Sequence, residues 1–229
     1  MTYLYIVGNG SKHNDMELRY SLRSVAKYGN ADKVVIVGHK PSFVTGVEHF
    51  PFKETDISYV NVWDKLMYAI RHIGEREIVV MNDDFFLLES YKPVVYSDGY
   101  LFEKHLSVKI NNAYHKALTH TICSLNTCKL GMVNYENHTP LPIKSVDLYG
   151  VLQTFNAHAP MCWRSLYGNL YCQEAQELKG LKLTKETINK AVSLIEGRPH
   201  FSIGDEFLAN LGANLFFEGL YPNKSKYEV

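Results

Sequence analysis

The sequence carries no excess charge of either sign. Its 24 lysines and arginines balance its 24 aspartates and glutamates, so the formal net charge is zero. A neutral chain has no overall electrostatic attraction to nucleic acid or to an anionic membrane surface, although it can still carry a local basic patch. The charge balance therefore gives no support for a protein whose main partner is a polyanion.

Long apolar runs are absent as well. No window approaches the roughly 20 apolar residues that cross a bilayer. The first residues, MTYLYIVGNG, lack the basic start and the long apolar stretch of a signal peptide. We therefore expect a soluble protein of the cytoplasm without a membrane span.

Cysteine is scarce, and its spacing matches no known motif. The four cysteines form two pairs whose members are five and ten residues apart: Cys123 with Cys128, and Cys162 with Cys172. These spacings fit neither a zinc ribbon nor a CxxC redox motif. We expect free thiols with a structural role.

Apolar residues, by contrast, are plentiful. They make up 46% of the 229 residues, and aromatic residues alone reach 13%. This is enough to bury a core in one domain, and we expect a single domain over 1–229. The aromatic residues suit a core, although they also suit a binding surface on which ligands stack.

Strand-length apolar runs alternate with helical patterns over the first 81 residues. The pattern predicts strand, helix, strand, helix and strand at 3–7, 16–29, 33–38, 61–74 and 77–81. A continuous apolar run such as KVVIVG is typical of a parallel strand that is covered on both faces. The alternation predicts an α/β fold with a mostly parallel sheet.

The pattern is looser in the remaining chain. Residues 92–105 suggest a hairpin with Asp98-Gly99 as its turn. Helices are predicted over 185–197 and from 204 onward, and we expect the polar tail 221–229 to be frayed.

Two adjacent acids follow the third strand directly, in the stretch EIVVMNDDFFLL. Ligands collect beyond the carboxyl ends of parallel strands, and Asn82, Asp83 and Asp84 occupy that position. Carboxylates there can bind Mg²⁺ or Mn²⁺ and leave coordination positions open for phosphate oxygens. The alternative is a turn with solvated acids.

Other residues suit a site less specifically. His138 lies in the Pro-containing loop NYENHTPLP and suits a general base, a metal ligand or a surface residue. Asp205 suits a helix cap or a third carboxylate. Arg19 and Arg23 share a helix face and suit either a diphosphate clamp or a solvated face. Glu17 stands where a capping box with Asn14 would place it.

Two of these stretches resemble the Stealth family of sugar-phosphate transferases. NDMELRYSLRSVAKYGNADKVVIVG is similar to the family's "NELRYSLRSIEKY…IYIVT" segment, and EIVVMNDDFFLL to its "FLYFNDDVFL" segment. NHTPLPIKSVDLYGVL is a weaker match to a later stretch in which His-x-Pro precedes a helix. The resemblance is good over about 14–90 and fair around 134–152.

The resemblance implies a GT-A-like fold and a nucleotide-sugar donor. A divalent cation, Mn²⁺ or Mg²⁺, would lie at Asp83 and Asp84, and residues 1–90 would form the donor half and 91–229 the acceptor half. The residues that would bind the donor are Glu17, Arg19, Arg23 and Asn82. The catalytic residues would be Asp84, His138 and Asp205.

Two blocks of the family are replaced, and this bears on the reaction. The family's "VYTWVDGSDP" block gives way to YLYIVGNGSKH, and "PTFNSHAIES" gives way to a segment in which Asn61 stands for the asparagine. We therefore expect a metal-dependent glycosyltransferase whose acceptor hydroxyl belongs to a glycan, a small molecule or a hydroxylated base of DNA. The alternatives are sugar-1-phosphate transfer of the Stealth type and an inactive sugar-nucleotide or glycan-binding domain.

Overall fold

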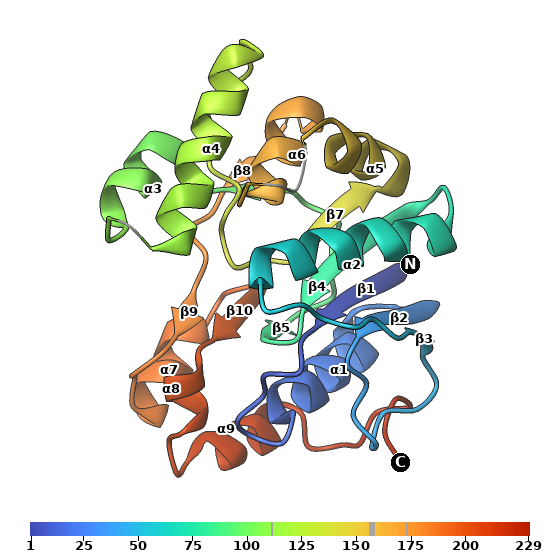
Figure 1. Ribbon diagram of the computed structural model, residues 1–229. Coiled ribbons are helices and arrows are strands. Elements are labelled where there is room, and N and C mark those ends of the chain that lie inside the picture. The colour runs from blue at the N-terminus through green and yellow to red at the C-terminus, as the bar shows by residue number, and fades with distance from the viewer. Residues whose placement is uncertain (111, 156–158, 173) are drawn as a thin grey trace.

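The computed structural model describes residues 1–110, 112–155, 159–172 and 174–229. Strands and helices alternate along the chain (Figure 1). The strands are β1 (Thr2–Val7), β2 (Lys33–Gly38), β3 (Glu48–Phe50), β4 (Glu77–Asn82), β5 (Phe85–Leu87), β6 (Tyr96–Ser97), β7 (Leu141–Lys144), β8 (Gln176–Glu177), β9 (Lys182–Leu183) and β10 (His200–Ile203). The helices are α1 (Met16–Tyr28), α2 (Ser58–Ile73), α3 (Leu101–Ser107), α4 (Ala113–Thr127), α5 (Ser145–Thr154), α6 (Trp163–Tyr171), α7 (Ile188–Ile195), α8 (Asp205–Leu208) and α9 (Ala213–Leu220).

The central sheet has the strand order β3-β2-β1-β4-β7. The first four strands run parallel, and β7 joins β4 in the antiparallel direction. The α/β class with a mostly parallel sheet is thus confirmed. The chain moves outward from β1 to β3 and then returns to place β4 on the other side of β1. The strand order therefore reverses between β1 and β4, which is where ligands bind in open α/β sheets.

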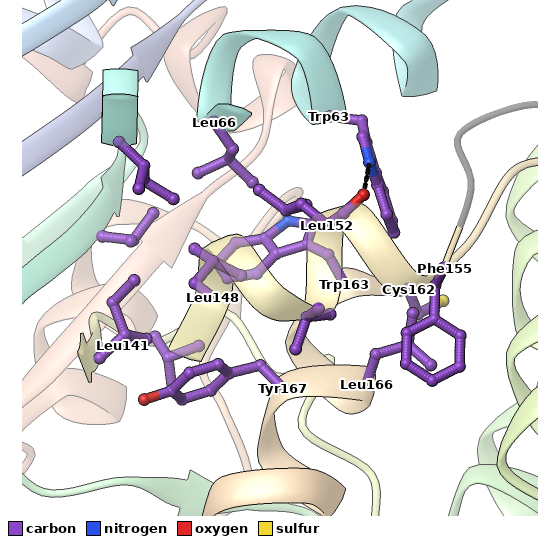
Figure 2. Packing of buried hydrophobic residues seen from close by; sticks show 14 of the residues in the cluster. Trp63, Leu66, Leu141, Leu148, Leu152, Phe155, Cys162, Trp163, Leu166 and Tyr167 are labelled. Carbon is purple, nitrogen blue, oxygen red and sulfur yellow. Dashed lines mark hydrogen bonds between the residues drawn. The ribbon is translucent and has the colours of Figure 1, made fainter. Parts of the chain in front are cut away.

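Both faces of this sheet are buried, as the continuous apolar strands predict. Alternate strand residues point to opposite faces. Leu4 and Val80 pack with α2, α4, α5 and α6, whereas Tyr5 and Met81 pack with α1. Figure 2 shows the first of these cores, in which the indole nitrogen of Trp63 donates a hydrogen bond of 3.1 Å to the carbonyl of Leu152.

A second sheet begins directly after the acid pair. It has the order β5-β10-β9 and packs with α7, α8 and α9, at the opposite end of the molecule from α3 and α4 (Figure 1). Phe86 of this sheet stacks with Phe201 and packs against Phe217, at centroid distances of 4.9 and 4.8 Å. Only Asp83 and Asp84 separate β4 from β5, so the acids form the corner between the two sheets.

The predicted hairpin at 92–105 is wrong. The backbones of Asp98 and Gly99 both bond to Asn134, and β6 pairs in parallel with β8. Gly99 does adopt a left-handed φ of +64°, but it leads the chain into α3 instead of into a second strand. The sequence suggested the turn residue correctly, but the strand's partner lies about 80 residues away, outside any local pattern.

The expected frayed tail is also wrong. The amide of Thr45 donates to the Tyr227 carbonyl and the amide of Val229 donates to the Phe43 carbonyl, each at 3.0 Å. Tyr227 and the Glu228 carboxylate are buried. The tail is polar in composition, but Tyr227 packs in the hydrophobic core and the buried Glu228 pairs with arginines of α1.

The helices predicted at 16–29, 61–74 and 185–197 are present with small changes at their ends, whereas the helix predicted from 204 onward is divided into the four-residue α8 and the separate α9. Thr187 caps α7 through its side chain, whereas Asp15 at the start of α1 makes no side-chain cap. The capping box with Glu17 is therefore absent. Across the described ranges, the helices are all too short or too polar to cross a membrane.

Candidate functional site

Two loops meet where the strand order reverses. In the parallel register Ile6 of β1 pairs with Asn82 of β4. Gly8 and Asp84 each come two residues later, so both leave the sheet at the same edge. The sheet topology thus brings the Gly8-Asn9-Gly10 loop next to the acid pair.

A pocket of about 560 Å³ opens at this edge, and we call it the acidic pocket. It gathers four of the sequence-predicted positions: Asp83, Asp84, Asp205 and, from the first turn of α1, Glu17. Its further lining includes Gly8, Gly10, Ser11, Lys12, Lys182, Gly204 and Glu206. The acids that follow a strand therefore face a ligand-sized space.

A second pocket of about 480 Å³ adjoins it, and we call it the aromatic pocket. Gly8 and Asp83 line both pockets, so the two spaces meet at Asp83. The aromatic pocket also contains the predicted residues Asn82 and His138. The rest of its lining includes Val62, Phe85, Tyr114, Glu136, Asn137, Trp163 and Arg164.

The electrostatics of Asp83 are unusual for a surface turn. Burial raises its pKa to about 7, and the neighbouring carboxylates of Asp84 and Glu17 contribute in the same direction. Burial disfavours the ionised form because it removes water, and nearby like charges add to that effect. Asp83 therefore exchanges its proton near neutral pH, which a solvated acid does not do.

Two carboxylate oxygens of the acidic pocket lack a hydrogen-bond partner. Asp84 Oδ2 accepts a hydrogen bond of 3.3 Å from Lys182, whereas the buried Asp84 Oδ1 and Glu17 Oε2 have no partner among the described residues. A buried oxygen without a partner costs roughly 1 to 3 kcal/mol or more. A bound cation would remove that cost at both atoms.

A complete metal cluster is not preformed. Within the described part of the chain, no three His, Cys, Asp or Glu side chains are grouped as metal ligands. Mg²⁺ typically binds through one or two carboxylates and completes its shell with water and substrate phosphates. Asp83 and Asp84 fit that kind of partial site, and they do not fit an all-protein cage.

His138 contacts the edge of Phe85, with a ring-centroid distance of 6.1 Å. Burial, together with the positive charges of Lys182 and Arg164, lowers the pKa of His138 to about 3. The imidazole is therefore neutral at physiological pH. It can donate or accept a hydrogen bond, but it is a weak base.

Asp205 lies at the rim of the acidic pocket. It begins α8, but the N-cap position belongs to Gly204 and no side chain caps the helix there. Its carboxylate instead forms an exposed ion pair with Lys12 at 3.1 Å. The helix-cap reading is therefore wrong, and Asp205 stays available to the pocket.

Arg19 and Arg23 do not lie in either of the two pockets. Both guanidinium groups bind the buried carboxylate of Glu228, at 3.0 and 2.9 Å. Arg19 also lies 3.9 Å from the centre of the Phe43 ring. The structure thus uses these residues to hold the C-terminal tail, and it does not place them with the acids.

Three residues of the site have no sequence signal that reveals them. Glu136, Arg164 and Lys182 reach the two pockets from segments 50 to 100 residues beyond the acid pair. Arg164 is buried and donates to the carbonyls of Thr139 and Asn137.

Comparisons with known proteins give a distant structural likeness. No protein-family model and no curated protein matches the chain. Among solved structures, the galactosyltransferase LgtC in complex with donor and acceptor sugar analogs is similar at 8% identity and a TM-score of 0.42, over 99% of this chain and 98% of that one. The glycosyltransferase GlyE of Streptococcus pneumoniae TIGR4 is similar at 7% identity and a TM-score of 0.40.

The coverage of GlyE is partial. The match spans 77% of this chain and 44% of one GlyE chain, and 98% of this chain and 65% of the apo-form chain. The chain is therefore shorter than the GlyE chains that it matches. Likeness at this level says nothing about activity.

Proposed function

We propose that this protein is a glycosyltransferase that takes a sugar from a nucleotide-sugar donor with the help of Mn²⁺ or Mg²⁺. One observation carries the proposal: the acid pair at the reversal of strand order lines a pocket in which the buried Asp84 Oδ1 and Glu17 Oε2 have no hydrogen-bond partner among the described residues. A turn with solvated acids has no such oxygens. The GT-A-like reading of the fold and the likeness of the acid segment to Stealth transferases agree with this assignment.

Each residue has a role in the proposal. Asp83 and Asp84 would hold the cation, which when bound neutralises the charge of the diphosphate leaving group. Lys12 and Lys182 offer positive charge to the same pocket, and the Gly8-Asn9-Gly10 loop allows close approach of the donor. Asp205 closes the rim of the pocket.

The acceptor would bind in the aromatic pocket. Neutral His138 and Asn82 can orient a hydroxyl group by hydrogen bonding. The acceptor oxygen then attacks the anomeric carbon, and the bond to the diphosphate breaks. Glycans, small molecules and hydroxylated bases in DNA all carry a suitable hydroxyl. Arg19 and Arg23 have no part in this assignment because both bind Glu228.

Sugar-1-phosphate transfer is the second candidate, because the acid segment resembles that of the Stealth family. In that reaction the acceptor attacks the β-phosphorus, and the pyrophosphate bond breaks in place of the bond to the anomeric carbon. A donor labelled at its β-phosphorus separates the two reactions: the label enters the product only in phosphosugar transfer.

The first experiment is a thermal-shift screen of UDP-, GDP-, CDP- and dTDP-sugars with and without Mn²⁺. A ligand present at 100 times its dissociation constant stabilises a protein by about 2.7 kcal/mol. We expect one donor class to raise the melting temperature only with metal. The shift should be absent in Asp83→Asn and Asp84→Asn and unchanged in the exposed control Asp56→Asn.

The outcomes are distinct. If no donor shifts the wild type, the proposed function is wrong. A donor that binds but is neither hydrolysed nor transferred indicates a sugar-nucleotide-binding domain. Because Asp83→Asn changes the stability of the free protein, the donor-induced shift is the quantity to compare.

A further inference from the structure

We propose that Glu136 is the catalytic base, and that it takes the proton of the acceptor hydroxyl inside the aromatic pocket. This inference rests on the proposed function and adds a residue to it. Glu136 lies in the loop before β7, and its side chain lines the aromatic pocket together with Asp83 and His138. Gly8 and Asp83 line both pockets, so a donor in the acidic pocket and an acceptor hydroxyl in the aromatic pocket would meet beside Asp83.

The two carboxylate oxygens of Glu136 have different environments. Oε1 accepts hydrogen bonds from the backbone amide and the hydroxyl of Ser165, both at 2.9 Å. Ser165 lies in the first turn of α6, so these bonds fix the carboxylate at the start of that helix. No hydrogen bond to Oε2 is found from any described residue. The second oxygen is therefore held in place yet free to accept a proton.

The surroundings of Glu136 make its carboxylate a stronger base than a solvated one. Burial raises the pKa of Glu136, and the charges of Arg164 on α6 and Lys104 on α3, with the bonds from Ser165, offset this only in part. Tyr114 of α4 lines the same space and brings no charge. A base is most effective when its pKa lies close to the working pH.

The other candidates in the site suit this step less well. His138 has a pKa of about 3, so it holds a transferred proton poorly. Asp83 is assigned to the cation. Asp205 is exposed, bound to Lys12 and outside the aromatic pocket.

The proposed step is balanced. The acceptor oxygen forms a bond to the anomeric carbon, and its proton passes to Oε2 of Glu136. The bond between the anomeric carbon and the diphosphate oxygen breaks, and its electron pair leaves with the nucleoside diphosphate. Glu136 then returns the proton to solvent. Hydrolysis follows the same path with water in place of the acceptor.

The test uses water as the acceptor. It compares the metal-dependent hydrolysis of the donor found in the thermal-shift screen for wild type, Glu136→Gln and the exposed control Glu89→Gln. The Glu136→Gln side chain keeps an oxygen that can accept the hydrogen bonds from Ser165, but it cannot take up a proton. We expect Glu136→Gln to bind the donor within about twofold of wild type and to hydrolyse it roughly 100-fold more slowly or worse. At metal and donor concentrations that saturate both proteins across the pH range, the acidic limb of the pH–rate profile should also disappear in Glu136→Gln.

Two further variants separate catalysis from stability. Ser165→Ala loses the hydroxyl bond but keeps the acid, so it should be less stable and still retain the acidic limb. Glu136→Asp keeps an acid at a shorter reach and should recover part of the rate. If Glu136→Gln hydrolyses the donor at the wild-type rate and with the wild-type pH profile, Glu136 is not the base, and the proposed function still stands. A wild type that binds no donor overturns both.

Discussion

Lys182 and Asp84 form an ion pair across the corner between the two sheets, with Lys182 Nζ 3.3 Å from Asp84 Oδ2. The two residues are 98 positions apart in the sequence. The Lys182 ammonium group faces a pocket that also contains Asp83 and Glu17, and Lys12 brings the second ammonium group, which is paired with Asp205. The free protein thus compensates only part of the negative charge that it gathers there, and the remainder is available to a cation.

Replacing this lysine should destabilise the protein in a pH-dependent way. Burial raises the pKa of Asp84, and Lys182 is the largest opposing influence. We expect Lys182→Met to lower the free energy of unfolding by about 1 to 2 kcal/mol at pH 8, where Asp84 would lose its counter-charge. At pH 4 the loss should be small, because protonated Asp84 needs no counter-charge.

Urea unfolding at both pH values measures this effect, and the exposed Lys185→Met is the control. An equal loss of stability at pH 4 and pH 8 would show that the lysine acts through packing and not through its charge.

Asp83→Asn should stabilise the free protein above neutral pH. The folded-state pKa of Asp83 is about 7, against its ordinary value of 3.8. A raised pKa means that its contribution to stability is fully present below about pH 4 and is lost as the pH rises through about 7. Asparagine does not ionise, so the variant should gain on the order of 2 kcal/mol at pH 8, or roughly 5 °C in melting temperature, and little at pH 4.

The exposed Asp64→Asn on α2 serves as the comparison for this variant. A melting temperature of Asp83→Asn that stays at the wild-type value from pH 4 to pH 8 would mean that Asp83 is solvated in the folded protein.

The C-terminal tail should be required for stability. The Glu228 carboxylate is 0% exposed and binds Arg19, Arg23 and Ser225. Burial acts to raise the pKa of Glu228, but the bonds from Arg23 and Ser225 outweigh it and hold the pKa at about 2. We expect Glu228→Gln to lose about 2 to 4 kcal/mol at pH 7, because it leaves two arginines without a counter-charge.

The pH dependence gives this prediction a second readout. A lowered pKa contributes stability above about pH 4.5 and loses it as the pH falls toward 2. The difference between wild type and Glu228→Gln should therefore narrow from pH 5 to pH 2.5 in denaturant unfolding. The exposed Glu177→Gln should match wild type throughout. A gap that stays constant over this range would contradict the ion-pair explanation.

The contrast between the acid pair and the arginines shows what this sequence could reveal. Asp83 and Asp84 were placed correctly because their position depends on a local fact, an apolar strand that ends just before them. Arg19 and Arg23 also share a helix face as predicted, but their partner is Glu228, more than 200 residues away. Periodicity identifies the face of a helix and carries no information about what covers that face.

The same limit applies to the pockets. Glu136, Arg164 and Lys182 have no special spacing relative to Asp83, because β7, α6 and β9 reach the site through long-range packing. The parallel strands were predictable from their continuous apolar runs, whereas β6 and β8 are only two residues long and depend on each other. Short elements of this kind follow from the tertiary fold and not from propensity.

Binding of a divalent cation should release protons from Asp83. A cation binds the ionised carboxylate, and with a pKa of about 7 Asp83 is mostly protonated at pH 6.5. We expect about 0.8 proton to leave per Mn²⁺ bound at that pH. Calorimetry in two buffers of different ionisation enthalpy, neither of which binds manganese, measures this number from the difference in observed heat. The apparent affinity should also rise with pH up to about 7.5 and then level off. Asp83→Asn should bind more weakly through Asp84 and lose most of the proton release. Identical heats in both buffers for the wild type would mean that the cation binds away from Asp83, and the assignment of the acid pair would have to be abandoned.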